Sequence, residues 1–495
     1  MSSDSMEKRD PSIEEKLPAP SDEMIEASHN VELDPLLDRR ITRKLDMHLL
    51  PWLFGIWFFA FIDRSNIGNA KISGLTTDLS LDGVKFNVVL SVFYILYILV
   101  DIPSNLIVKR IGAGHYIPML MTGWGIVTTF MGLTKSYAGL IVCRILLGLF
   151  EGGLFGGMIL YVSMFYPRHQ ILLRLGLWYC AAPLSGAIGG LLAAGLSQIH
   201  YDGYNSWPWI FIIEGAITTV FGSTAYFFLP HTPGTARFFT PEEQEAAVRR
   251  MHTDLSGAAA VKAVDQETFD WRWVKMALFN VNTALCCLNF FLILVPIYSY
   301  SLFLPTIIAG LGYKGVIAQL FTVPPNFLGF LSVIGCAYFS DRYKIRGPVI
   351  IAGALFAMIG YIMQIAGQTS GVKYAGTFFV AAGVFQMSPT VNAWLANNLA
   401  PHYVRATGGG LQVAIGNCAA FVATFTYLAQ DGPNYITGHS INLGALVLIV
   451  VVSCVNMAYV VWENKKRANG DRDHRLTKED EASLGFLHPR FRYTI

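Results

Sequence analysis

The chain has 495 residues, of which 53% are hydrophobic and only 14% are charged, and its formal net charge is +2. Its mean hydropathy of +0.44 excludes an ordinary soluble globular domain. The charge is close to neutral and the basic residues are spread between apolar stretches, which argues against a nucleic-acid-binding protein. Composition therefore predicts a membrane protein.

The two ends of the chain are polar. Residues 1–38 are acidic and lack the basic segment followed by an apolar segment that marks a cleavable signal peptide. Residues 465–495 follow the last apolar stretch and are also polar. We expect both ends to be disordered tails.

Apolar stretches long enough to cross a hydrocarbon core of ~30 Å, about 20 helical residues each, recur along the rest of the chain. They predict an all-α polytopic membrane protein with 12 transmembrane helices in two sets of six. The expected helices are 48–67, 86–108, 115–133, 138–163, 172–199, 208–229, 277–304, 317–339, 347–367, 373–398, 405–428 and 440–462. The two halves are then 39–230 and 276–464.

Residues 231–275 form a polar linker between the halves. Within it, Thr240 is a capping residue, Pro241 occupies the first helical position and Glu243 follows three residues after the cap. This pattern predicts the start of a short surface helix.

Basic residues favour one side of the predicted membrane segments. The loops on the side of the N-terminus carry Arg39, Arg40, Arg43, Lys44, Lys109, Arg110, Arg168, Arg174, Arg249, Arg250, Arg342, Lys344, Arg346, Arg405 and 465–467. The opposite loops carry scattered lysines such as Lys85 and Lys314. The positive-inside rule therefore predicts that both termini and the linker are cytosolic.

The chain offers no signature of a cofactor or metal site. All seven cysteines fall within apolar stretches, so no disulfide or zinc framework is predicted. No phosphate-binding loop of the Gly-x-x-x-x-Gly-Lys-Ser/Thr type occurs, so the chain has no ATP-hydrolysing motor of this kind. No arrangement typical of an intramembrane enzyme is found either. Transport would then run on ion gradients, without a cofactor.

Four charged residues inside predicted helices carry most of the functional information. Asp63 and Arg64 are adjacent in the first, while Arg144 and Glu151 are seven residues apart in the fourth. At 1.5 Å rise per residue, that spacing places the last two on one helix face, about 10 Å apart. A charge at the bilayer centre costs at least ~2.5–3.5 kcal/mol, so such residues pair and face a cavity.

Each of these residues has a predicted role. A carboxylate in a partly desolvated cavity can bind and release protons near neutral pH, so Glu151 is the candidate proton-coupling residue. Arg64 or Arg144 suits an anionic substrate or an internal acidic partner, because arginine stays charged and its planar fork matches a carboxylate. Asp63 can balance either arginine. The alternative is a fixed ion-pair network that holds the first and fourth helices together.

These residues lie in motifs that resemble the anion:cation symporter family of the major facilitator superfamily. The resemblance covers about residues 40–465 and is carried by Phe61–Ala70, by Arg144 with Glu151 and Gly152, and by Trp209–Gly215. It is closest to the fungal allantoate-permease branch. The runs Asn397–His402 and Gln412–Asn417 are similar to its nicotinic-acid permeases. This resemblance implies the major facilitator fold, with substrate bound between the two six-helix halves.

The resemblance also implies site residues. Proton coupling and anion binding are assigned in this family to positions that match Asp63, Arg64, Arg144 and Glu151. Substrate-pocket positions match Tyr97 and Asn417. The loop after the second helix departs from the family pattern, because Lys109 stands at a usually acidic position. That departure leaves Asp341 and Arg342, after the eighth helix, as the expected cytosolic gate.

We therefore expect a proton-coupled symporter that imports a small organic anion such as nicotinate, allantoate or a related carboxylate. The expected partners are the substrate, protons and the lipid bilayer, with no nucleic acid, and the expected state is a monomer in the plasma membrane. Two alternatives stay open: an exporter of an acidic fungal metabolite, and a nutrient receptor that binds its ligand without transporting it.

Overall fold

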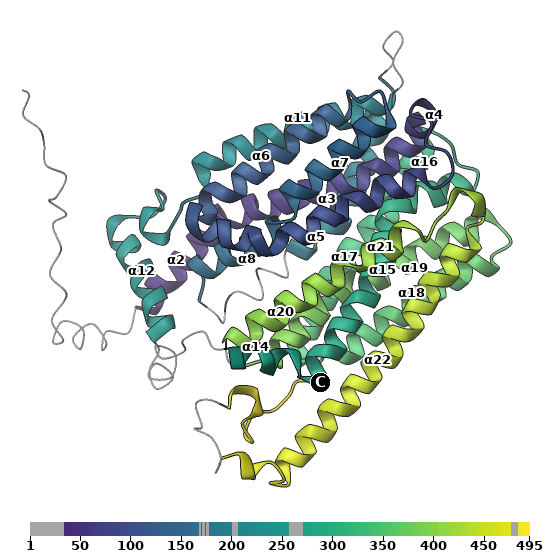
Figure 1. Cartoon of the computed structure of the whole chain (residues 1–495). Helices are drawn as coiled ribbons and strands as arrows, with labels where there is room; N and C mark the ends of the chain where they lie inside the picture. The colour runs from purple at the N-terminus through teal and green to yellow at the C-terminus, as the bar shows by residue number, and fades with distance from the viewer. Residues whose placement is uncertain are drawn as a thin grey trace, which may run out of the picture.

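The computed structural model describes residues 34–167, 170, 174, 178–199, 206–256, 271–400, 402–476 and 484–495, and the regular elements in these ranges are all helices. Two groups of long helices lie side by side (Figure 1). The first group contains α3 (Leu50–Ala70), α5 (Lys85–Ile111), α6 (Ala113–Met131), α7 (Tyr137–Glu151) continued by α8 (Leu154–Phe165), α10 (Ala181–Leu196) and α11 (Trp207–Phe228). The second contains α15 (Val281–Gly310), α16 (Val316–Leu320) with α17 (Val323–Tyr343), α18 (Gly347–Ala366), α19 (Ser370–Asn397), α20 (His402–Asn417) with α21 (Ala419–Thr424), and α22 (Ile436–Ala468).

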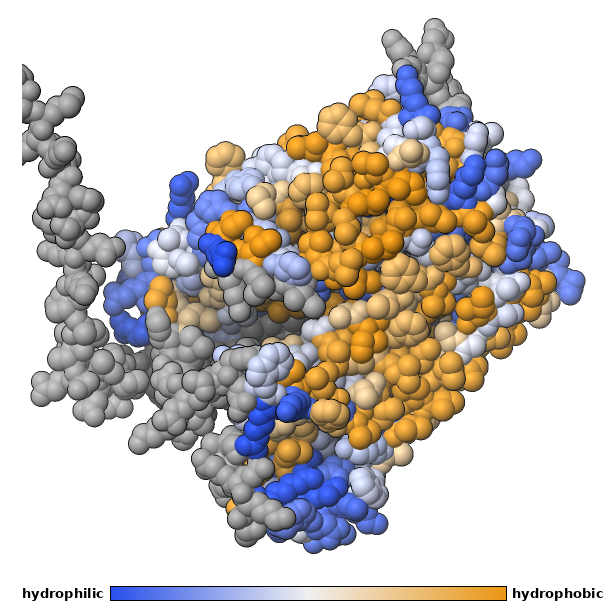
Figure 2. Space-filling model, in the orientation of Figure 1, coloured by the Kyte–Doolittle hydropathy of each residue, from blue (hydrophilic) through white to orange (hydrophobic). Residues whose placement is uncertain are grey.

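These segments correspond one to one with the 12 predicted helices, and the predicted all-α membrane fold is confirmed. Among the described residues, eight helices are long and apolar enough to cross a membrane by length and composition alone. The predicted start of the fifth helix, at residue 172, lies outside the described residues. Figure 2 shows apolar side chains gathered in a broad belt over both groups, with polar side chains at the two ends. Such a belt matches a surface that faces lipid.

Shorter helices cover the end of the molecule that carries the linker. They are α2 (Pro35–His48), α12 (Pro241–Ser256) and α14 (Trp271–Leu278). The predicted cap of α12 is confirmed: Thr240 Oγ1 accepts from Glu243 N at 3.3 Å, and Thr240 N donates to Glu243 Oε2 at 2.9 Å. The Glu243 carboxylate also accepts from Lys44 Nζ at 2.6 Å, which ties α12 to α2.

The expectation of disordered ends is wrong where the structure describes them. Residues 34–38 open helix α2, which begins after an Asp34 side-chain cap. At the other end, α22 continues to Ala468, and residues 484–495 pack against the second half. Tyr493 and Phe486 are buried there. Residues 1–33 lie outside the described part of the chain.

The two halves touch at one end and separate at the other. Near α4 (Thr76–Asp78), Asn87 Nδ2 donates to the Thr424 carbonyl at 2.6 Å, and Gln319 Nε2 donates to Ser73 Oγ at 2.9 Å. At the end that carries α2, α12 and α14, a cavity of about 510 Å³ lies between α8 of the first half and α17, α19 and α20 of the second. The molecule is therefore closed at the α4 end and open at the other.

A close contact between α5 and α7 fixes how these two helices of the first half pack together. At Gly148 an added Cβ would collide with the Phe93 carbonyl of α5, and at Gly152 with the Tyr97 carbonyl. Glycine lets the two backbones approach this closely. α7 and α5 thus cross at the level where α7 carries Glu151 and α5 carries Tyr97.

We predict that Gly148→Ala lowers the stability of the protein by about 1–3 kcal/mol, because the new methyl group must push α5 away. The measurement is thermal unfolding in detergent. Gly335→Ala is the matched control, since Gly335 lies in helix α17 and a Cβ there meets open space. Equal unfolding temperatures for the two variants would contradict the close contact.

Candidate functional site

A small cavity of about 60 Å³ lies at the centre of the molecule between the two halves. Its wall is mostly aromatic and aliphatic, with a few polar groups from both halves. The lining residues are Trp57, Phe61, Arg64, Tyr97, Phe155, Tyr179, Ala182, Phe290, Leu294, Ile297, Tyr298, Phe385, Ser388, Val413 and Asn417. Phe155, Tyr179 and Val413 also line the larger cavity, so the centre adjoins the open end. An apolar cavity with few convergent polar groups is the usual form of a small-molecule site.

Arg64 is the charged group on this wall. Its Nε donates to Glu151 Oε2 at 2.6 Å, and the exposed fractions of the two side chains are 7% and 0%. The guanidinium carbon lies 4.6 Å from the centre of the Tyr97 ring and 5.6 Å from that of Phe93. The arginine is therefore held by a buried carboxylate on α7 and by aromatic rings on α5, and both are strong modes of cation binding.

Asp63 has a different environment, although it is the neighbour of Arg64 in the sequence. Its Oδ2 accepts from Trp124 Nε1 at 3.1 Å and from Thr218 Oγ1 at 3.5 Å, which links α3 to α6 and α11. Successive residues on a helix point about 100° apart, so one side chain can reach the cavity while the next packs inside the half. Asp63 is not among the cavity-lining residues.

Arg144 is buried, with 2% of its surface exposed, and also does not line the central cavity. Its Nε and Nη2 have no hydrogen-bond partner among the described residues, and none of the described carboxylates lies within 4 Å. The charges of Glu151 and Asp63 act on it from farther away. The predicted four residues therefore form one buried cluster, in which Arg64 reaches the cavity and the other three lie behind it.

A further carboxylate belongs to this region. Glu214 on α11 is buried, and neither of its oxygens has a hydrogen-bond partner within the described ranges. It interacts electrostatically with Asp63. The first half thus holds three buried carboxylates close to two arginines.

The second half contributes Asn417 and Tyr298, whose hydroxyl donates to Asn417 Oδ1 at 2.9 Å. Asn417 and Tyr97 were singled out in the sequence, and both line the cavity. Tyr298 and Tyr179 were missed, because an aromatic residue inside an apolar helix gives no signal that separates a pocket wall from packing. Tyr179 lines both cavities, and its hydroxyl accepts from Asn392 Nδ2 at 2.6 Å. This contact joins the two halves where the central cavity adjoins the larger one.

The predicted gate residues are only partly brought together. Asp341 lines the large cavity and pairs with Arg346 at 2.6 Å, whereas Arg342 is exposed and is not among the lining residues. Arg346 also donates to Ser340 Oγ at 2.7 Å and so closes the turn between α17 and α18. Arg346 is thus a residue of the cavity mouth that the sequence did not indicate.

Metal-binding geometry is missing from the described part of the chain: no group of three His, Cys, Asp or Glu side chains is placed to hold an ion. The seven cysteines are free thiols. The chemistry that this arrangement supports is reversible binding of an anion beside a buried carboxylate that can take up a proton.

Comparisons with known proteins agree with this architecture. Residues 53–424 match the family model of the Major Facilitator Superfamily. An uncharacterized transporter of Schizosaccharomyces pombe is 35% identical over 472 residues, which cover 94% of this chain and 92% of that protein. The high-affinity nicotinic acid transporter of Saccharomyces cerevisiae is 33% identical over 462 residues, covering 92% and 85% of the two chains.

Among solved structures, the xylose transporter XylE of E. coli has a TM-score of 0.61 at 15% identity, covering 82% of this chain and 95% of that one. This likeness shows the fold. Together with the helix arrangement, these matches establish that the chain belongs to the Major Facilitator Superfamily and is a multi-pass membrane transporter of a small molecule.

Proposed function

We propose that the chain is a proton-coupled symporter that imports a small organic carboxylate, with nicotinate as the first candidate and allantoate or a related acid as the next. The observation that carries the proposal is the position of Arg64, which lines the central cavity and is bound from behind by the buried carboxylate of Glu151. A fixed cation on an apolar wall is suited to an anionic substrate.

Competition between Glu151 and the substrate carboxylate for Arg64 would couple the movement of protons to that of the substrate. An ionised Glu151 occupies the arginine through the 2.6 Å contact of its Oε2. A proton on Glu151 removes that negative charge and frees the guanidinium for the carboxylate of the substrate. Because unbalanced charge is costly in a buried site, the proton and the anion would enter and leave together. The second oxygen of Glu151, Oε1, has no hydrogen-bond partner among the described residues and is available to carry the proton.

The remaining cavity wall favours a flat, partly apolar acid. Phe61, Tyr97, Tyr298 and Phe385 offer ring faces and edges, and Asn417 offers an amide. A pyridine carboxylate can stack on such rings while its carboxylate meets Arg64. The relative described as a nicotinic acid transporter supports the same choice.

We further propose that both termini and the linker 231–275 are cytosolic and that the chain works as a monomer in the plasma membrane, with halves 39–230 and 276–464. Basic residues near α2, α12 and α14 support this orientation under the positive-inside rule. The cavity of about 510 Å³ would then open to the cytosol, with Asp341 and Arg342 near its gate.

The test is uptake of labelled nicotinate, and of a panel of small carboxylates, in cells that express the chain. We expect uptake that rises as the external pH falls and that an uncoupler abolishes. Cells with the empty vector give the background. Uptake that ignores the proton gradient would refute proton coupling. Efflux from preloaded cells without uptake would favour the exporter, and saturable binding without flux would favour the receptor.

A further inference from the structure

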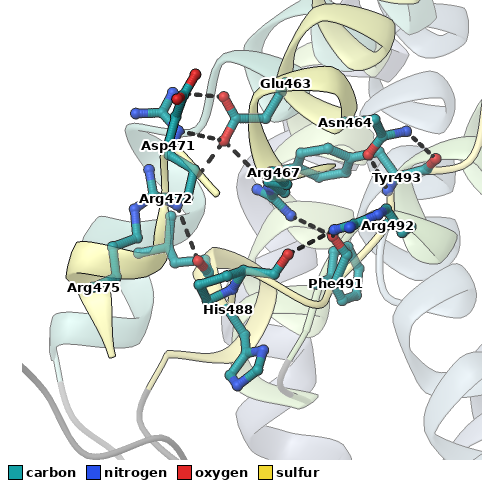
Figure 3. Close-up of polar contacts among 12 residues, drawn as sticks. Glu463, Asn464, Arg467, Asp471, Arg472, Arg475, His488, Phe491, Arg492 and Tyr493 are labelled. Carbon is teal, nitrogen blue, oxygen red and sulfur yellow. Dashed lines mark hydrogen bonds and ion pairs between the residues drawn. The ribbon is translucent and has the colours of Figure 1, made fainter. Parts of the chain in front are cut away.

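The last residues of the chain are tied to the second half through backbone groups. Asn464 of α22 donates to the Tyr493 carbonyl at 2.9 Å and accepts from Tyr493 N at 2.9 Å (Figure 3). Asn398, after α19, holds Thr494 in the same two-way manner at 3.1 and 2.7 Å. Arg467 adds a contact to the Phe491 carbonyl at 2.9 Å. These contacts therefore fix residues 484–495 beside the end of α22.

Beside it lies a second cavity, of about 610 Å³, bounded by α14, the start of α15, the end of α22 and residues 484–495. Five basic side chains and one acidic side chain line it. They are Arg272, Lys275, Arg467, Arg472, Arg475 and Glu463. Leaving Arg272 aside, the described lining residues carry four formal positive charges against one negative, a net of +3.

The single carboxylate is already fully engaged. Glu463 accepts from Arg467 Nε at 3.2 Å and from Arg472 Nη2 at 2.6 Å, while Arg475 stands 4.0 Å away (Figure 3). Asp471 acts on Arg472 as well, but it does not line the cavity. Glu463 is the one carboxylate among the described lining residues, and Arg467, Arg472 and Arg475 share it, so these arginines together with Lys275 give the cavity a positive field.

Arg475 shows the effect of that field. Burial lowers the pKa of its guanidinium, and the positive charge of Arg472 lowers it further, although Glu463 opposes the shift. An added anion would relieve this repulsion. A neutral group points the same way: Asn280 lines the cavity, is 6% exposed, and its Nδ2 has no acceptor among the described residues. A buried donor without an acceptor is destabilising, and an oxyanion would satisfy it.

The rim of the cavity is suited to a membrane surface. On α14, Trp271 is 68% exposed, and the following Phe279 is 84% exposed, whereas Trp273 is buried. Lys275 lies on the same short helix. Exposed aromatic residues mixed with basic ones are typical of a helix at the headgroup level of a bilayer. Since α15 enters the membrane segment at Val281, the cavity lies where a leaflet presents its headgroups.

We propose that this cavity binds a phosphate-bearing anion, and specifically the phosphorylated headgroup of an anionic lipid from the adjoining leaflet. Basic pockets between transmembrane helices are suited to such headgroups. The acyl chains would follow the apolar rim at Trp271 and Phe279, and the phosphates would meet Lys275 and Arg475. A bound headgroup would connect α14 and α22 to the C-terminal segment.

The test uses the full chain in a neutral detergent and measures its unfolding temperature. The probes are dioctanoyl phosphatidylinositol 4-phosphate, its soluble headgroup inositol 1,4-bisphosphate, and dioctanoyl phosphatidylcholine. We expect a saturable rise on the order of a few °C with the first probe. Lys275→Gln/Arg475→Gln should weaken the apparent affinity for it at least about tenfold, because hydrogen bonds to charged groups are lost.

The matched control is Arg39→Gln/Arg43→Gln, which removes two exposed basic residues of α2 at the same end of the molecule. It should keep the full response. An equal rise with phosphatidylcholine, or an unchanged response of the Lys275/Arg475 variant, would overturn the site. An equal rise with inositol 1,4-bisphosphate would overturn the lipid as the source. If the Lys275/Arg475 variant is less stable, native mass spectrometry of the purified proteins takes the place of the unfolding measurement. The wild type should retain the lipid through purification, and the variant should not.

Discussion

Replacing Glu151 with glutamine is expected to abolish proton-driven accumulation of the substrate while exchange of substrate across the membrane survives. Glutamine has the shape of the protonated acid and cannot ionise. It would therefore leave Arg64 free for the substrate at every pH, because the charged contact of 2.6 Å is lost. Because the variant cannot take up or release a proton at this position, the proton gradient no longer drives uptake, and accumulation above the external concentration should be lost.

The measurement compares labelled nicotinate uptake under an imposed proton gradient with counterflow into substrate-loaded vesicles. Glu214→Gln is the matched control, because Glu214 is equally buried but makes no contact with Arg64. It should retain both activities. A Glu151→Gln variant that still accumulates substrate in an uncoupler-sensitive way would remove Glu151 from the coupling step. Loss of exchange together with uptake would favour the fixed ion-pair network.

The contacts of the buried cluster bear on the fixed ion-pair network. Arg64 and Glu151 do form a close pair between α3 and α7, as a fixed network requires. Yet Arg144 has two nitrogens without hydrogen-bond partners in the described structure, and Glu151 has one such oxygen. A network built purely for stability would leave few such groups, because each unsatisfied buried group costs about 1–3 kcal/mol. Groups that change partners during transport would show this pattern.

Much of the fold follows from sequence alone, because membrane helices are specified by length and hydropathy. The lipid core demands about 20 apolar residues and full backbone hydrogen bonding, so few arrangements are allowed. The cap at Thr240 was also predictable, since it depends on residues three apart. The lipid environment thus determines the membrane helices, and a local capping pattern determines the start of α12.

The pairing within the site was not predictable in the same way. Sequence placed Arg144 and Glu151 on one face of α7, and both are buried there. It could not decide which arginine meets Glu151, because that depends on the rotation of α3 against α7. The orientation of α7 depends in turn on contacts such as Gly148 against the Phe93 carbonyl of α5, which join residues 55 positions apart.

The C-terminal segment was missed for a related reason. Taken as a whole, residues 465–495 are polar, and polar composition usually indicates disorder, although residues 484–495 contain apolar side chains such as Phe486 and Tyr493 that are buried in the fold. What orders it is a small number of specific contacts, in which the amides of Asn464 and Asn398 pair with the backbone of Tyr493 and Thr494. Such pairing leaves no periodicity or hydropathy signal in the sequence.

Arg64→Lys is expected to weaken the binding of the carboxylate substrate about 10- to 100-fold, while the protein still folds. Lysine keeps the positive charge, so Glu151 is not left as an unpaired buried charge, which would cost about 3–5 kcal/mol. It lacks the planar fork, however, and cannot meet both oxygens of the substrate carboxylate together. It also loses most of the stacking on the Tyr97 ring, which lies 4.6 Å from the Arg64 guanidinium carbon.

The measurement is the concentration of nicotinate that half-saturates uptake, together with direct binding to the purified protein. Arg144→Lys is the control, because Arg144 is buried in the same cluster but does not line the cavity. It should alter substrate affinity much less than Arg64→Lys does. The reverse order of effects would move the substrate carboxylate from Arg64 to Arg144. It would also mean that the cavity must rearrange during transport, because Arg144 does not line it in this structure.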